Sequence, residues 1–358
     1  MRTALAHKRF LAILIIAALL SFTAIFAINI TFDPYYDFAY LTGIRGAAPM
    51  TVINYAELKY KLVLMQELRG QHAVVLVGAS TTAGIDPEQG VLPTNRPVYN
   101  LAFSGADIYQ LEVFLDKLLG IDPHLDIFVG LDFFGAKARA APDLLYVGSQ
   151  RNRYKEDALL RLIDTQTTLD YLHDRMDSGL VFSGYGARRF KSAQAPSDEI
   201  SVSRLYWGKV YSNYTIAPDY KSRLARIASM FDRVTFFINP LYVEHYRFLK
   251  EIGLDEAYCN WINEVHAFPN VDFSFSETSL NPRNYHDAEH YSERAGFGLL
   301  ATMLRDRSDA EERRDTLDPA SCRAAFEKID RKAPSQQPAP NAAPVARSGA
   351  IDTDEQHP

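Results

Sequence analysis

The chain has 358 residues, of which 47% are hydrophobic and 12% aromatic, so it can bury a sizeable core and is not disordered throughout. Lys and Arg number 38 against 44 Asp and Glu, and the resulting net charge of −6 argues against a general nucleic-acid binder, which needs a basic surplus. Two cysteines are too few for a disulfide scaffold or a four-cysteine zinc site.

The first feature along the chain is an uncharged apolar segment at residues 10–30, FLAILIIAALLSFTAIFAINI. A helix of about 20 residues is long enough to cross the hydrocarbon core of a bilayer. The basic residues before it are Arg2, Lys8 and Arg9. Because cytoplasmic flanks carry the excess of Lys and Arg, the sequence predicts a transmembrane anchor with residues 1–9 in the cytoplasm and the rest outside.

A cleaved signal peptide is the alternative to this anchor. Its cleavage site would need small residues at two positions, and Ile25 stands two residues before Ala27, so the pattern is poor. In an exported body, Cys259 and Cys322 would meet an oxidising environment. A disulfide between them and two unrelated free thiols both remain open.

Residues 31–69 are expected to form a juxtamembrane connector with a helix over 55–68. Beyond it, short apolar runs that suit buried parallel strands alternate with stretches of helical periodicity over residues 70–306. The expected strands are 73–77, 98–103, 127–134, 234–238 and 271–275. The expected helices are 108–119, 156–176, 220–231, 242–252, 256–268 and 292–305. This alternation predicts an α/β domain whose mostly parallel sheet is covered on both sides.

The third and fourth strands are far apart, which predicts a large insertion at about 136–217. Its aromatic residues argue against disorder, and we expect it to fold over the carboxyl edge of the sheet. Its basic residues would meet an anionic sugar or form a solvated loop: Arg188, Arg189, Lys191 and Arg204. Residues 307–331 are expected to form a C-terminal extension, and the Pro-, Ala-, Gln- and Ser-rich residues 332–358 a disordered tail.

Chemistry-bearing residues follow the first two strands. Ser80 lies in the tight turn Gly-Ala-Ser after the first strand, at the sheet edge where α/β proteins bind ligands. It suits a nucleophile beside an oxyanion-binding backbone, although a serine there can also be an ordinary helix N-cap. The second strand leads into Asn100-Leu-Ala-Phe-Ser-Gly105, where Gly105 lets the backbone approach a ligand at the same edge.

A third cluster, Asn-Tyr-His-Asp-Ala-Glu-His-Tyr, lies just before the last expected helix of the sheet domain. Asp287 stands three residues before His290, so the carboxylate can orient the imidazole while the other ring nitrogen takes a proton from a serine. A solvated polar loop is one alternative. A metal pair of His286 and His290 is another, but it lacks a third obvious ligand and the glutamate of the zincin motif.

Together these pieces resemble the GDSL/SGNH esterase and acetyltransferase superfamily over roughly residues 70–306. The matching stretches are VLVGAS around Ser80, NLAFSGA around Gly105 and DAEH at 287–290. The resemblance implies a three-layer, flavodoxin-like sheet of about five parallel strands. It implies Ser80 as nucleophile, His290 as general base and Asp287 as the residue that orients it. The backbone N–H groups of Ser80 and Gly105 would form part of the oxyanion hole.

The third family block departs from the pattern. The family places an asparagine after the third strand, whereas this chain has Asp132, and an ionised carboxylate cannot donate to an oxyanion. The missing donor then comes from another strand end, such as Asn100 or Asn239, or Asp132 is protonated or structural.

The anchored, outward-facing arrangement resembles that of cell-envelope polysaccharide O-acetyltransferases, which implies a single-pass protein of a bacterial inner membrane with its C-terminal domain in the periplasm or outside the cell. We therefore expect a serine esterase or O-acyltransferase acting on an acyl ester, with acetyl on a carbohydrate as the favoured substrate. A non-catalytic SGNH-like protein that binds polysaccharide or an assembly partner is the alternative. No cofactor, metal or nucleic acid is expected to take part, and the sequence identifies no protein partner.

Overall fold

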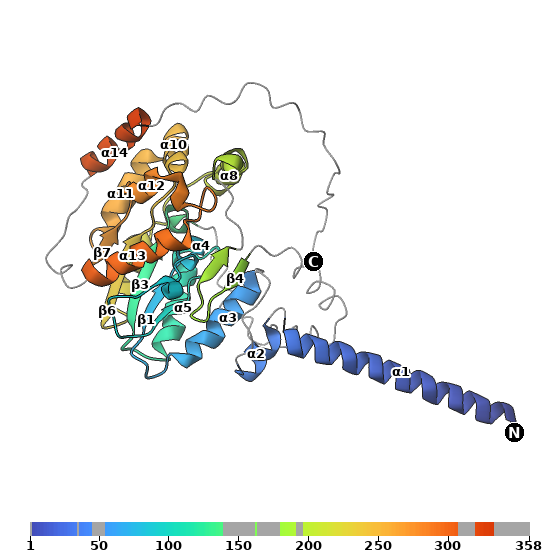
Figure 1. Ribbon diagram of the computed structural model, residues 1–358. Helices are drawn as coiled ribbons and strands as arrows, with labels where there is room; N and C mark the ends of the chain where they lie inside the picture. The colour runs from blue at the N-terminus through green and yellow to red at the C-terminus, as the bar shows by residue number, and fades with distance from the viewer. Residues whose placement is uncertain are drawn as a thin grey trace, which may run out of the picture.

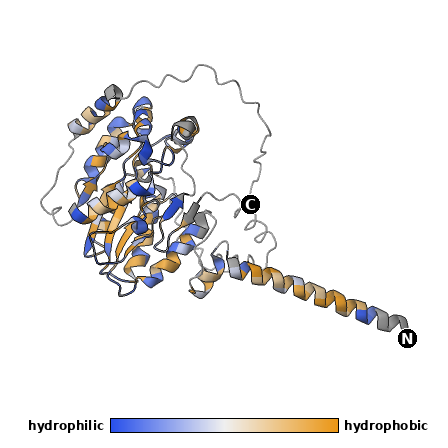
Figure 2. Cartoon of the chain, in the orientation of Figure 1, coloured by the Kyte–Doolittle hydropathy of each residue, from blue (hydrophilic) through white to orange (hydrophobic). Residues whose placement is uncertain are grey.

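The computed structural model describes residues 2–33, 36–44, 54–138, 162, 180–190, 196–306 and 319–332. The first element is the long helix α1, Arg2–Phe32, which extends away from the folded body (Figure 1). Its residues His7–Thr31 form one helix that is long and apolar enough to cross a membrane, as either a span or a signal sequence, and it is the single such helix within the described ranges. Figure 2 shows it as a nearly continuous apolar rod. The sequence prediction of one apolar N-terminal helix is confirmed.

The body contains a five-stranded parallel sheet, as the sequence predicts. Its strands lie in the order β2-β1-β3-β6-β7. Their bounds are Val74–Val77 for β1, Val98–Asn100 for β2, Asp126–Leu131 for β3, Arg233–Ile238 for β6 and Asn270–Asp272 for β7. Every residue of β1 and β3 is buried, so other elements cover both faces of these central strands.

The helices before, between and after these strands have the predicted places, with ends shifted by up to three residues. Their bounds are Asn54–Glu67 for α3, Ile108–Leu119 for α5, Tyr220–Ala228 for α9, Val243–Glu251 for α10, Asp255–Val265 for α11 and Glu293–Asp306 for α13. Helix α5 begins at a capping box, in which Asp107 accepts from the backbone of Gln110 and the Gln110 side chain accepts in return. Helices α5, α9 and α11 contact one another in series.

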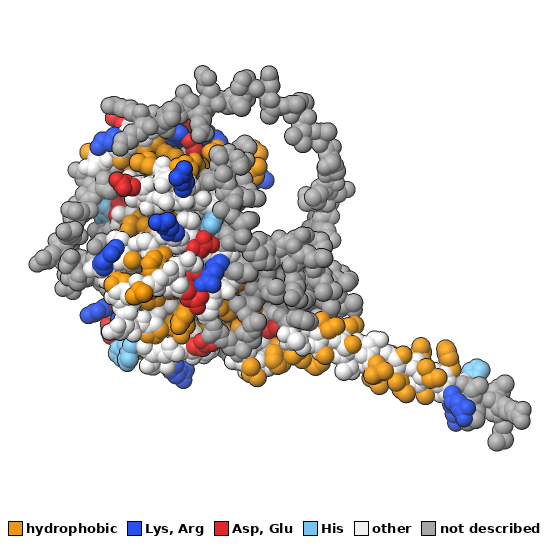
Figure 3. Space-filling model, viewed as in Figure 1, with side chains coloured by type: hydrophobic (Ala, Val, Ile, Leu, Met, Phe, Trp, Pro, Cys, Tyr) orange, Lys and Arg blue, Asp and Glu red, His pale blue; other side chains and the backbone are white. Residues whose placement is uncertain are grey.

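Short elements complete the connections. They are α2 at Asp37–Thr42, α4 at Ser80–Ala83, α12 at Glu277–Leu280, and the 3-10 turns η1 at Pro87–Gln89, η2 at Phe133–Ala136 and η4 at Pro282–Asn284. On the face seen in Figure 3, acidic and basic side chains are interspersed over the body, whereas apolar side chains cover α1.

The chain leaves and re-enters the sheet domain at one point, where Lys137 and Ile216 form an antiparallel bridge. Between them the structure places the hairpin of β4, Leu180–Phe182, and β5, Arg188–Phe190, followed by helix α8, Pro196–Val210. The sequence did not predict α8, because its residues mix Ser, Arg, Tyr and Gly without a clear apolar period. The helix expected at 156–176 lies outside the described residues, apart from Leu162.

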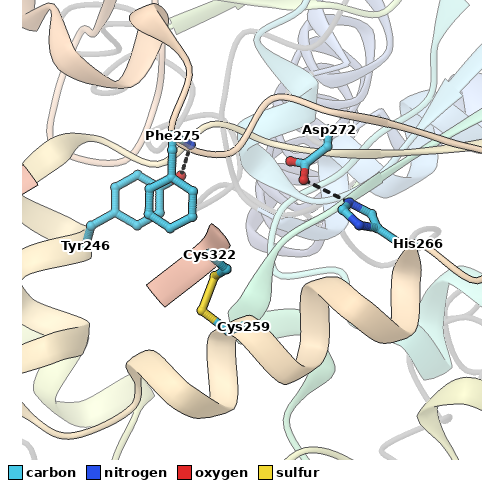
Figure 4. The surroundings of a disulfide bond; sticks show 6 residues. All are labelled: Tyr246, Cys259, His266, Asp272, Phe275 and Cys322. Carbon is cyan, nitrogen blue, oxygen red and sulfur yellow. Dashed lines mark hydrogen bonds and ion pairs between the residues drawn. A yellow bond between two sulfur atoms is a disulfide. The ribbon is translucent and has the colours of Figure 1, made fainter. Parts of the chain in front are cut away.

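The C-terminal extension contains a helix, α14, Pro319–Lys332, that packs on α10 and α11. A disulfide joins Cys322 of α14 to Cys259 of α11, so of the two alternatives left open by the sequence the paired one is observed (Figure 4). Phe326, one turn further along α14, is buried against the rings of Tyr246, Tyr258 and Phe275. The tail expected at 332–358 lies outside the described residues, except Lys332.

Candidate functional site

The strand order identifies a candidate ligand-binding edge between β1 and β3. From β1 the chain adds β2 on one side and β3 on the other, so the sheet reverses its winding at this point. In open α/β sheets, the crevice at the carboxyl ends of such strands is where ligands bind. Ser80, which starts α4 directly after β1, and Asp132, which follows β3, both lie there.

The turn that carries Ser80 packs closely against β3, and neither Gly78 nor Gly130 at this contact has room for a side chain. A Cβ on Gly78 would lie 2.4 Å from the Thr82 hydroxyl oxygen, and a Cβ on Gly130 would lie 2.0 Å from the same atom. That hydroxyl accepts a hydrogen bond from the Asn239 side-chain amide at 3.0 Å. Thr82 therefore fills the space between two strands and fixes α4, with Ser80 half-buried at its start.

Asn100 supports this turn from the other side. Its side-chain amide donates to the backbone oxygens of Thr82 and Ile85, both at 2.8 Å, and its Oδ1 accepts the N–H of Ala102 at 3.0 Å. Both amide hydrogens are therefore used inside the fold, and the side chain is fully buried. The suggestion that Asn100 donates to an oxyanion is corrected: it is a structural residue that holds the turn after β1.

Gly105 lies at the same edge as Ser80. The backbone N–H of Phe103 donates to Gly78 O at 3.0 Å, which keeps the segments after β2 and β1 side by side. Gly105 follows two residues later, is exposed, and has φ +68°. Because side chains disfavour this left-handed conformation, glycine suits the position.

The predicted pair of Asp287 and His290 is formed. Nδ1 of His290 lies 2.8 Å from Asp287 Oδ2 and 3.0 Å from Oδ1. Oδ1 also accepts the backbone N–H groups of Glu289 and His290, each at 2.7 Å. Burial by itself would raise the pKa of Asp287, but the His290 bond and charge and these N–H groups outweigh it, so the pKa is lowered.

Neighbouring contacts bring His290 to the edge that holds Ser80. The hydroxyl of Tyr291, the next residue, donates to Asn239 Oδ1 at 3.1 Å, and Asn239 in turn bonds Thr82 of α4. A Cβ on Gly84, which ends α4, would lie 3.6 Å from Tyr291 O. These contacts place the loop with His290 beside the C-terminal part of α4, the short helix that begins at Ser80.

His286 stabilises this loop through both its main chain and its ring. Its backbone N–H donates to His290 O at 2.8 Å, and its Nε2 lies 2.6 Å from Glu293 Oε2. Among the residues that the structure describes, no group of three or more His, Cys, Asp or Glu side chains is placed to hold a metal ion. His286 thus closes the loop onto the start of α13.

Asp132, which follows β3, is buried. Both of its carboxyl oxygens are shielded from solvent and lack a hydrogen-bond partner at ordinary distance and angle among the described residues. Burial raises the pKa of Asp132 to about 7, against the side chains of Asn239 and Thr81 and the charge of His290, which favour the ionised form. Near neutral pH the carboxyl is therefore partly protonated and can donate a hydrogen bond, which an ionised aspartate cannot.

A contact that the sequence did not indicate stabilises the His290 loop, and Trp207 makes it. Trp207 of α8 donates from Nε1 to Glu289 Oε1 at 2.7 Å, directly beside His290. The indole also stacks on His245 of α10, with ring centroids 4.3 Å apart. The aromatic content of the insertion was the available signal, but nothing local in the sequence relates Trp207 to Glu289, 82 residues away.

No protein-family model matches the chain, and no curated protein is detectably similar to it. The arrangement of the site therefore rests on the geometry above.

Proposed function

We propose that this protein is an SGNH-type serine esterase or O-acyltransferase that faces the cell envelope and acts on an acyl ester, with acetyl carried by a carbohydrate as the favoured substrate. The observation that carries the proposal is the Asp287–His290 pair held beside α4, whose first residue is Ser80. Ser80 and the turn that carries Asp287 and His290 are far apart in the sequence, and both lie at the carboxyl edge of the sheet, where α/β proteins bind ligands.

In this mechanism the Ser80 hydroxyl attacks the carbonyl carbon of the ester while Nε2 of His290 takes its proton. Asp287 accepts a hydrogen bond from the Nδ1–H group, which leaves Nε2 as the basic nitrogen, and its charge stabilises the imidazolium that forms. The tetrahedral intermediate then expels the alcohol, which takes the proton from His290, and an acyl-Ser80 remains. Water or a sugar hydroxyl attacks the acyl group in the second step, with His290 again as base, and releases Ser80.

Backbone N–H groups stabilise the developing oxyanion. The backbone N–H groups in the first turn of a helix have no acceptor within that helix. Ser80 is the first residue of α4, so its N–H is one of these groups and suits an oxyanion. Gly105, exposed and in a left-handed conformation at the same edge, supplies the second N–H. Losing one such donor commonly costs on the order of 100-fold or more in rate, so the two positions carry much of the catalysis.

Two observations support an exported, anchored body. The disulfide between Cys259 and Cys322 fits an oxidising compartment outside the cytoplasm. Helix α1 continues without a break to Phe32, and the side-chain amide of Asn29 donates to Leu162 O at 3.2 Å, so the end of the apolar segment is packed on the body. Signal-peptide cleavage would remove a part of the fold, and we therefore propose a retained bacterial inner-membrane anchor with the body in the periplasm.

Replacement of Ser80 by alanine tests the function. The full chain in detergent should hydrolyse p-nitrophenyl acetate, and S80A should fall to the buffer rate while its circular dichroism is unchanged. S276A is the matched control, since Ser276 precedes α12 and plays no part in the mechanism. Equal turnover by wild type and S80A, well above buffer, would remove Ser80 from the mechanism.

The buried carboxyl of Asp132 in the place of the family's asparagine favours one second candidate, a non-catalytic protein of the same fold that binds polysaccharide or an assembly partner. The same measurements separate the two: a wild-type protein that neither hydrolyses the ester nor reacts with a fluorophosphonate supports the binding role.

A further inference from the structure

A buried network of charged side chains lies beside the segment after β2, outside the proposed triad. Glu57 and Lys61 of α3 are fully buried, and Arg188 of β5 is 4% exposed. Arg188, for which the sequence left open contact with an anionic sugar or a solvated loop, is thus inside the protein. Charged groups are seldom buried so completely, because their desolvation is costly unless partners surround them. This arrangement fixes the positions of its members more strongly than apolar packing would.

The network converges on Ser104. Glu57 Oε2 accepts three hydrogen bonds: from the backbone N–H of Ser104 at 2.9 Å, from its hydroxyl at 2.8 Å, and from Arg188 Nη2 at 2.8 Å. Arg188 Nη2 also contacts the Ser104 hydroxyl. Backbone and side chain of Ser104 are therefore held at once, and the peptide that follows carries the N–H of Gly105.

Lys61, one turn after Glu57, holds the preceding residues. Its Nζ donates to Asn100 O at 2.9 Å and to Gly186 O in the β4–β5 turn. The turn is pressed onto the end of β2: Asn100 N–H donates to Tyr185 O at 2.8 Å, and a Cβ on Gly186 would lie 2.3 Å from Asn100 O. Helix α3 and the hairpin thus hold this segment at both Asn100 and Ser104, and leave Gly105 exposed.

The same helix is attached to the membrane-proximal segment. Lys59 of α3 forms a buried ion pair with Asp37 of α2, and the rings of Tyr60 and Tyr36 meet edge to face at 5.1 Å. Asp33, just after α1, accepts the backbone N–H groups of Phe38 and Ala39. In Figure 1, α2 and α3 lie between α1 and the sheet. Helix α2 therefore contacts both the residue that follows α1 and helix α3, so these three segments are linked.

We propose that Glu57, Lys61 and Arg188 are positioning residues that set the Gly105 N–H for the oxyanion, so that the membrane-proximal helix α3 is a working part of the active site. The role rests on the proposed function of Gly105. It predicts that loosening the network slows acylation of Ser80 without weakening the binding of substrate, because the oxyanion forms only in the reaction.

The test uses the full chain in detergent micelles and the variants S104A, E57Q and E57Q/R188M. S104A removes one hydroxyl and keeps the ion pair. E57Q leaves the charge of Arg188 buried without its partner, which can by itself prevent folding. The double variant removes both charges and therefore tests the network without an unpaired buried charge. D126N is the matched control, since Asp126 is a buried carboxylate paired with Arg96 at the opposite edge of the sheet.

The first readout is the kcat and KM of p-nitrophenyl acetate hydrolysis. We expect kcat to fall at least fivefold in S104A and more than tenfold in E57Q and in the double variant, with KM within twofold. In D126N we expect kcat within twofold at a temperature where circular dichroism shows it folded. Unchanged kcat in S104A and in a folded Glu57 variant would overturn the positioning role.

The second readout is amide hydrogen exchange of residues 101–106, which does not require activity. We expect exchange at Ser104 and Gly105 to rise more than tenfold in the folded Glu57 variant, with the β3 amides unchanged. If exchange rises but the wild type has no esterase activity, the proposed function fails while the network is still shown to hold the segment. If exchange does not change, the inference fails regardless of activity.

Discussion

Asp287 holds His290 by both its main chain and its ring. Oδ1 accepts the His290 backbone N–H at 2.7 Å, and Oδ2 lies 2.8 Å from the ring nitrogen Nδ1. The three-residue spacing lets one carboxylate do both within a single turn, so the imidazole cannot rotate without losing a charge-assisted bond. The orientation of the proposed general base is thus encoded locally, and the rest of the fold has only to bring this turn to α4.

Replacement of Asp287 by asparagine should therefore abolish most of the activity. An asparagine amide placed at Nδ1 favours the tautomer with its proton on Nε2, which cannot accept the Ser80 proton. In related Asp–His–Ser arrangements this change costs on the order of 10⁴-fold in kcat, and we expect a loss of similar size in D287N. Steady-state hydrolysis of p-nitrophenyl acetate measures it.

D272N is the matched control for D287N. Asp272 forms the same kind of pair with His266, whose Nε2 lies 2.9 Å from Oδ2, and this pair lies near the disulfide (Figure 4). Asp272 is on β7, which β3 and β6 separate from β1, the strand that leads to Ser80. We expect D272N to keep kcat within a few-fold of wild type. Equal losses in the two variants would mean that the Asp287 effect is one of stability alone.

Asp132 should make stability depend on pH in the neutral range. Burial raises its pKa from 3.8 to about 7, so the folded chain binds a proton that the unfolded chain releases between these values. The contribution of this group to stability therefore falls as the pH rises from about 4 to about 7. D132N lacks the group and should be more stable than wild type at pH 8 by roughly 1 to 4 kcal/mol, with a smaller difference at pH 5.

Chemical denaturation of both proteins at pH 5, 6, 7 and 8 checks this dependence. D116N, a change at an exposed carboxylate of α5, should follow the wild-type curve at every pH. A difference between D132N and wild type that stays constant with pH would mean that the Asp132 carboxyl does not change its charge in this range.

Gly130 should tolerate no side chain. Its Cβ would lie 2.0 Å from the Thr82 hydroxyl oxygen and 2.7 Å from the Phe237 ring, so both would have to move. Overpacking of this kind costs about 1 to 3 kcal/mol, and here it also displaces the helix that carries Ser80. G130A should lower both the melting temperature and kcat.

Gly298 of α13 provides the control for that substitution. A Cβ there would meet no heavy atom within 4 Å, and alanine is favoured over glycine inside a helix by about 1 kcal/mol. We expect G298A to melt at the wild-type temperature or above it, with kcat unchanged. A G130A protein as stable and active as G298A would contradict the packing of Thr82 between β1 and β3.

The disulfide should stabilise the body through α14. Its cysteines are 63 residues apart, and closing a loop of this length in the unfolded chain is worth about 4 kcal/mol in the chain-entropy estimate. C259A/C322A should therefore unfold at lower denaturant than wild type. Reductant should lower the wild-type midpoint toward that of the variant and leave the variant unchanged. A wild-type midpoint insensitive to reductant would show that the bond adds little.

The regular part of the fold was predictable because the signals are local. Strand β3 is a continuous apolar run, and α5 carries its own capping box, so pattern alone places both. Helix α8 was missed because its sequence has no clear apolar period. The hairpin of β4 and β5 was missed for a different reason: its three-residue strands are stabilised by contacts with α3 and β2, which are distant in the sequence.

In the candidate site, too, contacts between residues close in the sequence were predictable and contacts between distant residues were not. Asp287 and His290 are three residues apart, so their pairing follows from spacing. The sequence could not show that the Asn100 side chain bonds the backbone of Thr82 and Ile85, because these partners are 18 and 15 residues away. The network around Glu57 joins residues 47 and 131 positions apart, and no local pattern marks it.

Reaction with a fluorophosphonate probe, followed by peptide mass spectrometry, tests the central claim most directly, because the probe labels only a serine whose hydroxyl is activated. We expect a single labelled serine, Ser80, in the folded full-length chain, and strongly reduced labelling in H290A and D287N. A folded protein that leaves Ser80 unmodified, or that is labelled at another serine while Ser80 stays free, would contradict the account.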